Sequence, residues 1–206
     1  FLSRLPSRLG QYLGTTGARL DGADCVALGL ATHYVPSDRL PELKAKLKEA
    51  PAAVGAVLAE AAAVPPTSRL MEHASAISEL FASDTLEDIL LALQHDSSDF
   101  GVETLKTLLS RSPQSLKVTL RLLAEGLFRT DFADEMRTEY RLVSRICQRP
   151  DFIEGVRAVI VDKTNDAAWN PASPQDVTDA LLDGLFAPLP SDQEWSPFPD
   201  LSGDIS

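Results

Sequence analysis

Apolar residues recur at intervals of three and four along most of this chain, which is the period of an amphipathic helix. The pattern begins with Leu2, Leu5, Leu9 and Leu13, and Pro6 places the start of the regular helix near residue 6. Further helices in the first half are predicted at 23–30, 38–47, 51–64, 70–81 and 85–93. The stretch 51–64 is rich in alanine, so its helix has high propensity but only small side chains.

Short local signals mark the start of one of these helices and suggest a strand. Residues 84–87 (DTLE) resemble a capping box that opens the helix at 85–93. Residues 32–35 (THYV) are β-prone, and Pro36 stops them. A helix, a short strand and a proline in this order suggest the edge of an α/β layer.

The helical signals become stronger after Phe100. Ser112 before Pro113 predicts an N-cap followed by a proline at the first helical position, and leucines then repeat every three or four residues to 127. A second long helix is predicted from Asp131 until Pro150 ends it, and Asp151 is expected to cap a third. We therefore expect a helical subdomain here.

Beyond residue 163 the helical pattern gives way to proline and aspartate, and only 176–185 is predicted to add a helix. The last twenty residues contain Pro188, Pro190, Pro197 and Pro199, which lack the backbone donor that helices and sheets need. We expect an extended tail, of a composition that is normally ordered only where a partner holds it.

Composition and charge narrow the class of protein. The 206 residues allow one or two small domains, and the sequence has no run of about 18 apolar residues that could span a bilayer. The formal net charge is −11, with nine acidic residues against Lys163 alone from position 162 onward. This balance argues against a general nucleic-acid surface, because binding phosphates requires clustered Lys and Arg. Since Phe1 opens inside an apolar pattern without a Met, we expect a piece of a longer protein.

The usual catalytic motifs are missing from the sequence. His33, His73 and His95 have no second ligand at metal-binding spacing, so no metal site is predicted. There is no glycine-rich phosphate loop and no G-x-S-x-G turn. Cys25 and Cys147 are expected to be free thiols of a reducing compartment, each buried as a small hydrophobe on a helix face. The residues alone indicate a largely helical segment without a self-contained active site.

Three stretches, in this order and spacing, resemble the second half of the 3-hydroxyisobutyryl-CoA hydrolases of the crotonase superfamily. The first comprises 1–6 (FLSRLP), 13–24 (LGTTGARLDGAD) and 29–35 (GLATHYV). The second comprises 112–120 (SPQSLKVTL) and 125–126 (EG). The third comprises 151–158 (DFIEGVRA), 161–163 (VDK) and 169–171 (WNP). Each is weak alone, and the three together are fairly specific.

The resemblance covers residues 1–35 and about 98–171 well. It implies a mainly α fold in this chain, made of the C-terminal end of a crotonase-type α/β spiral core plus its helical cover. Residues 1–36 would then end the core, 37–171 would form the helical C-terminal region, and 172–206 an acidic, proline-rich tail.

The same resemblance implies an enzyme that hydrolyses an acyl-CoA thioester in valine breakdown, in the mitochondrial matrix. The coenzyme A belongs to the substrate, and no other cofactor is expected. In the family the amides that bind the thioester oxyanion and the catalytic acids come from the core half, so we expect no catalytic residue here. Because such donors are usually the largest catalytic contribution, this chain alone should be inactive.

Lys163 is the single ligand-binding position that the resemblance carries over. It matches a basic residue which, in related superfamily members, helps to hold the coenzyme A nucleotide. The alternative is an ion pair of Lys163 with its neighbours Asp162 and Asp166. Glu154 and Arg157 are expected to brace helices, and Trp169 is expected to pack.

A second hypothesis, of a different class, is structural. Some relatives of this hydrolase are subunits of the small subunit of mitochondrial ribosomes, so the chain could be a non-catalytic ribosomal protein. The proline-rich tail favours this hypothesis, since a partner would order it. The acidic charge limits contact with RNA to the end that carries Arg4, Arg8 and Arg19, so its partners would be mainly proteins. Neither hypothesis involves a membrane.

Overall fold

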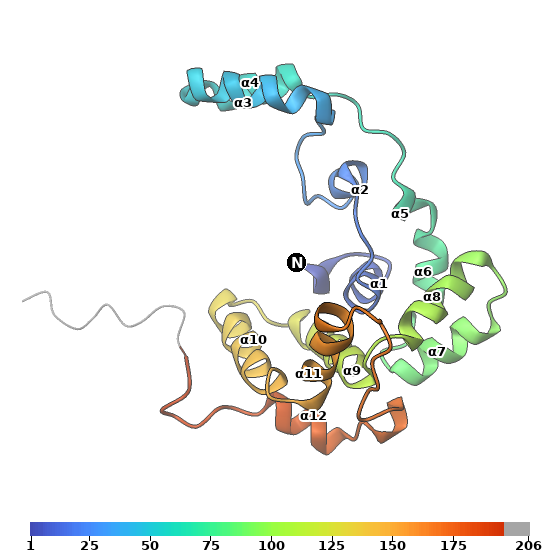
Figure 1. The fold of residues 1–206 in the computed structure, drawn as a ribbon. Helices are drawn as coiled ribbons and strands as arrows, with labels where there is room; N and C mark the ends of the chain where they lie inside the picture. Colours follow the sequence, from blue (N-terminus) through green and yellow to red (C-terminus); the bar gives the residue numbers. More distant parts are fainter. Residues whose placement is uncertain (196–206) are drawn as a thin grey trace, which may run out of the picture.

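The computed structural model describes residues 1–195, and over this range the chain is built from helices (Figure 1). Within these residues the sole β pairing is an isolated bridge between Tyr34 and Ala63. The β-prone stretch 32–35 therefore forms no strand with a partner strand in this chain. None of the described helices is both long and apolar enough to cross a bilayer.

The first half of the chain contains mostly short helices. In order they are η1 (Leu2–Arg4), α1 (Leu9–Thr16), α2 (Gly22–Ala27), η2 (Ser37–Arg39), α3 (Leu40–Glu49), η3 (Pro51–Ala53), α4 (Val54–Ala61), α5 (Arg69–Glu72) and α6 (Ala74–Leu80). The first predicted helix begins later than expected, because Ser7 and Arg8 adopt left-handed conformations before α1. The helix predicted at 70–81 is divided into α5 and α6 at His73.

The second half contains the longer helices. In order they are α7 (Leu86–His95), α8 (Asp99–Leu109), α9 (Pro113–Gly126), α10 (Phe132–Ile146), α11 (Pro150–Val156), the π-helical segment η4 (Arg157–Val161), η5 (Pro174–Asp176) and α12 (Asp179–Phe186). Helices α9 and α10 lie where leucine spacing and caps predict them. Helix α8 is not among the predicted helices.

Side-chain caps account for most of these helix starts. The Ser112 Oγ accepts from the Ser115 amide as predicted, and the Asp131 carboxylate accepts from the Ala133 amide at the start of α10. The predicted capping box at 84–87 is wrong by one residue, because Thr85 is the N-cap of α7. Asp151 is not an N-cap either: it lies inside the first turn of α11, and its carboxylate binds elsewhere.

One large apolar core joins the N-terminal helices to the middle of the chain. It contains side chains from α1 and from α5 to α9, with Phe81, Ile77 and Leu9 fully buried. The rings of Tyr12 and Phe81 meet edge to face, with their centroids 5.7 Å apart. This core fixes the end of α1 against α9.

Helices α3 and α4 form an arm that extends away from this body (Figure 1). The arm has its own small apolar cluster of Leu43, Val57 and Ala61. Lys46 on α3 also binds Glu60 on α4, with an Nζ–Oε1 distance of 2.8 Å.

A third apolar cluster attaches α12 to the body. Val177, Leu182 and Leu185 pack against Val118 of α9 and Leu142 of α10. The predicted tail from 172 thus includes a helix with its own packing partners, while the proposed boundaries at 36 and 171 stay predictions.

Residues 187–195 contain no helix or strand, in keeping with their prolines. This segment is held by arginines of α10. The Arg145 guanidinium donates to the carbonyls of Ala187 and Pro188, at 2.6 and 2.9 Å, and Arg141 binds Glu194 at 2.7 Å. The rest of the predicted tail, 196–206, lies outside the described residues.

Candidate functional site

A cavity of about 700 Å³ lies where α1, α9, α11 and η4 meet. All three stretches that carry the family resemblance contribute to its lining. Its apolar and small residues include Gly14, Gly17, Leu116, Phe152, Gly155, Val156, Val159, Ile160 and Trp169, and its polar residues include Thr15, Thr16, Arg111, Ser112, Ser115, Thr119, Asp151 and Asn165. The three stretches that are far apart in the sequence therefore line one cavity.

The buried carboxylate of Asp151 links the second and third of these stretches. Asp151 is 4% exposed. The Ser112 hydroxyl donates to one of its oxygens, and the Asn170 amide donates to the other at 2.6 Å. Because Asp151 lies near the N-termini of α9 and α11, the positive ends of both helices favour its negative charge.

Further hydrogen bonds close the cavity around this carboxylate. Arg111 donates to the Thr16 carbonyl at the end of α1, at 3.1 Å, which ties the first stretch to the second. The Trp169 indole nitrogen donates to the Ser110 carbonyl at 3.0 Å. The Trp169 ring lies against Gly155, where an added Cβ would be in van der Waals contact with it at 3.4 Å. Trp169 packs, as predicted.

The π-helical turn η4 shapes another side of the cavity. Its amide of Asp162 reaches back to the Arg157 carbonyl at 2.8 Å. This wider turn brings Val159 and Ile160 into the lining, although both side chains keep more than half of their surface exposed. Single π turns are rare and recur at functional sites.

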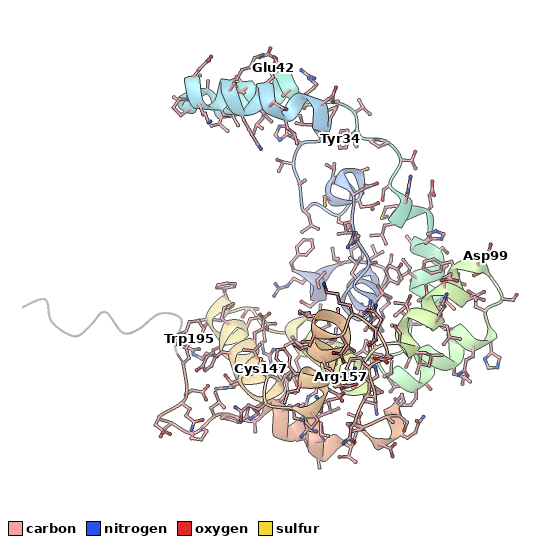
Figure 2. The ribbon with its side chains drawn as sticks, in the orientation of Figure 1. Tyr34, Glu42, Asp99, Cys147, Arg157 and Trp195 are labelled. Atoms are coloured by element: carbon pink, nitrogen blue, oxygen red, sulfur yellow. The ribbon has the colours of Figure 1, made fainter. Side chains whose placement is uncertain are left out.

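Arg157 is the centre of a network of carboxylates beside η4 (Figure 2). Its guanidinium binds Glu154 through two nitrogens, at 2.8 and 2.7 Å. It also binds Asp162 at 2.7 Å and Asp166 at 3.1 Å. Glu154 in turn accepts from the Ala168 amide at 2.7 Å, next to Trp169. Both residues therefore brace this region, as predicted.

The network changes the protonation equilibria of its members. Hydrogen bonds from Arg157 and from the Ala168 amide lower the pKa of Glu154 from its ordinary 4.5 to about 2. Hydrogen bonds from Thr164 and Arg157 lower the pKa of Asp166 as well. The hydrogen bonds to Glu154 and the two aspartates raise the pKa of Arg157.

Lys163 follows η4 and lies outside the cavity lining. Its side chain is exposed, and its backbone is left-handed with φ 57°. The alternative ion pair with Asp162 and Asp166 is wrong, because Arg157 binds both carboxylates and Lys163 makes no ion pair with any residue of the described range.

The other candidate residues stay separate from this site. Across residues 1–195 no three His, Cys, Asp or Glu side chains are placed to hold a metal ion. Both cysteines are free thiols, with Cys25 half-buried. The expectation that Cys147 is buried is wrong, because it is exposed at the end of α10 (Figure 2).

The family of this chain follows from its likeness to known proteins. The profile of the enoyl-CoA hydratase/isomerase family matches residues 1–186. The chain belongs to this family.

Several curated relatives of this chain are named as 3-hydroxyisobutyryl-CoA hydrolases. The human mitochondrial hydrolase is 40% identical over 201 residues, which is 93% of this chain and 52% of the relative. The mitochondrial hydrolase of Xenopus tropicalis is 38% identical over 198 residues, 92% and 51% of the two chains. A probable hydrolase of Arabidopsis thaliana is 34% identical over 208 residues, 95% and 55% of the two chains. This chain therefore spans about half the length of these relatives.

Solved structures of two acyl-CoA enzymes have the same fold over the matched part. A carnitinyl-CoA dehydratase from Mycobacterium thermoresistibile superposes with a TM-score of 0.85 at 36% identity, covering 91% of this chain and 54% of that one. An enoyl-CoA hydratase from Rhodobacter sphaeroides gives 0.82 at 34% identity, covering 94% and 55%. The chain is thus a mainly helical part of a crotonase-type fold.

Replacing Asp151 should test the bridge at the bottom of the site. We expect Asp151→Ala to lower the free energy of unfolding by about 3 kcal/mol, because it leaves the buried Ser112 hydroxyl and the Asn170 amide without their acceptor. Urea unfolding followed by the fluorescence of Trp169, the neighbour of Asn170, would measure this loss. Asp99→Ala, at an exposed position in the first turn of α8, should cost under about 1 kcal/mol. Equal losses in both variants would contradict the bridge.

The lowered pKa of Glu154 predicts a pH dependence of stability. A carboxyl whose folded pKa is about 2 stabilises the fold fully above its unfolded pKa of 4.5, and this contribution is lost as the pH falls to about 2. Urea midpoints of the wild type and of Glu154→Gln should therefore converge between pH 5 and pH 2. A difference that stays constant over this range would contradict the assignment.

Proposed function

We propose that this chain supplies the C-terminal, helical half of a 3-hydroxyisobutyryl-CoA hydrolase. The observation that carries the proposal is the coincidence of two findings. Relatives with this name share 34–40% identity over 92–95% of the chain, and the motifs that mark the likeness meet around one cavity. The full protein would then hydrolyse an acyl-CoA thioester once this half packs on the core half. The human and Xenopus tropicalis hydrolases are named as mitochondrial, which supports a mitochondrial location, and we propose the matrix.

The reaction adds water across the thioester. The water oxygen bonds to the carbonyl carbon, the carbon–sulfur bond breaks, and the coenzyme A sulfur leaves with a proton. Amide donors for the oxyanion and a base for the water are the groups this step requires. In our proposal the core half provides them.

The lining of the cavity fits this division of labour. Asp151 and Arg111 are the charged residues of the lining, and both are engaged in hydrogen bonds within the protein. The two oxygens of Asp151 already accept from Ser112 and Asn170, so neither is placed as a general base. We infer that this half contributes shape and exclusion of water, and no catalytic residue.

Lys163 is our proposed contact for the coenzyme A nucleotide. The substrate carries this group, so no separate cofactor is involved. Lys163 is an exposed ammonium outside the cavity, on the loop that follows η4. A compact cation on a flexible stem suits a phosphate group.

The structural alternative, a non-catalytic subunit of the mitochondrial ribosome, has less support. It depends on a tail that only a partner would order. Up to residue 195, however, Arg141 and Arg145 of the same chain hold this segment. The curated relatives described above are named as hydrolases, and we therefore favour the enzyme.

The decisive measurement is release of free thiol from 3-hydroxyisobutyryl-CoA by the protein with its core half in place. We expect turnover with the wild type. Ile160→Trp should reduce kcat/KM at least about tenfold, because the larger indole would narrow the cavity that the substrate has to enter. The neighbouring Val161→Trp is the control, since Val161 is equally exposed but does not line the cavity.

Well-folded protein that releases no thiol would reject the proposed hydrolysis. Its sedimentation with mitochondrial small ribosomal subunits would then support the structural alternative. Equal activity of the two tryptophan variants would show that the cavity is not part of the active site.

Lys163→Ala should raise the KM for the coenzyme A ester about three- to tenfold, as expected for the loss of one exposed contact between a cation and a phosphate. The kcat should hardly change, because the nucleotide lies far from the thioester carbon. Steady-state kinetics would measure both constants. Lys106→Ala, at an exposed lysine of α8, serves as the control. An unchanged KM in Lys163→Ala would remove the proposed role.

A further inference from the structure

We propose that Arg157 is a positioning residue for coenzyme A, acting through Lys163. It keeps neighbouring carboxylates occupied and fixes the turn from which Lys163 extends. This inference rests on the proposed function, because it concerns the coenzyme A contact of that enzyme.

The first step concerns competition for the Lys163 ammonium. Asp162 precedes Lys163 directly, and Asp166 follows three residues later. In the structure both carboxylates bind Arg157, at 2.7 and 3.1 Å. A guanidinium presents a rigid planar fork of donors that matches the two oxygens of a carboxylate, a geometry that an ammonium lacks. Arg157 thus leaves the Lys163 charge available for a ligand.

The second step concerns the backbone. Lys163 has φ 57° and Asn165 has φ 55°, both in the left-handed region that residues with a side chain rarely adopt. Each such residue costs about 1 kcal/mol, so surrounding contacts have to hold it. The contacts present include the Arg157 ion pairs on either side of Lys163 and the Thr164 hydroxyl, which donates to Asp166. The Asn165 amide also donates to the Ala158 carbonyl at 3.0 Å.

The third step concerns the charge of the loop. Three carboxylates surround one guanidinium, and Glu154 makes two hydrogen bonds to it. Losing Arg157 would leave all three carboxylates without their cation. They would then attract Lys163 away from a phosphorylated ligand. The arginine therefore matters more for an anionic ligand than its partly exposed position suggests.

A pair of substrates separates this role from a purely structural one. The 3-hydroxyisobutyryl thioester of coenzyme A carries the nucleotide, whereas the corresponding pantetheine thioester lacks it. In the protein with its core half, we expect Arg157→Gln to raise the KM for the coenzyme A ester about tenfold and to change kcat less than about twofold. The KM for the pantetheine ester should not change. Arg137→Gln is the control, because Arg137 forms a local ion pair with Asp134 on α10.

A double variant tests whether Arg157 acts through Lys163. If it does, Arg157→Gln should add little to the KM increase caused by Lys163→Ala, since the contact is already lost. Arg157→Lys should be intermediate, because it retains the charge without the fork, and it also serves if Arg157→Gln fails to fold. Equal effects on the two esters, or additive effects of the two substitutions, would overturn the proposal.

A direct measurement of coenzyme A binding tests the role of Arg157 separately from the proposed hydrolase activity. Calorimetric titration with coenzyme A itself, and with pantetheine for comparison, needs no turnover. If the wild type releases no thiol, the hydrolase proposal fails, and weaker binding of coenzyme A but not of pantetheine by Arg157→Gln would still support the positioning role. Unchanged binding of coenzyme A by this variant would reject it.

Discussion

The arrangement of the site depends on one buried carboxylate. Asp151 accepts hydrogen bonds from Ser112, which also caps α9, and from the amide of Asn170 in the loop that returns from η4. A buried charge is stable only when its oxygens are satisfied, so the three segments that supply these groups have to come together for any of them to be placed. The cavity is the space that this arrangement encloses.

The apolar core and the exposed Arg157 network have different roles around this carboxylate. The apolar core of α1 and α5 to α9 fixes the walls that α1 and α9 form, whereas the Arg157 network holds a loop at the surface where water screens each ion pair. Single exposed pairs contribute little to stability, but a shared guanidinium determines which oxygens face it. The core therefore determines the shape of the cavity, and the Arg157 network orients the charged groups at the surface.

The sequence predicts the helices with strong local signals and fails where partners are distant. Ser112 before Pro113 is a correct N-cap because its chemistry is local. Asp151 resembles a cap as well, but its partner Asn170 is nineteen residues away and cannot be inferred from spacing. Three carboxylates lie close in sequence to both Arg157 and Lys163, so the sequence does not show which cation binds them. The structure shows that all three bind Arg157. Helix α8 went unrecognised beside a polar connection, and Cys147 is exposed because α10 ends there.

The arm formed by α3 and α4 should open independently of the rest of the structure. Its small apolar cluster is separate from the main core, and a single bridge between Tyr34 and Ala63 pairs the two connections at its base. Segments with few buried contacts open at low free energy, independently of the global fold. Amides of the arm should therefore exchange with solvent as one cooperative unit, ahead of those in α9. Because no residue of the arm lines the cavity, insertions or deletions within the arm should leave the cavity unchanged.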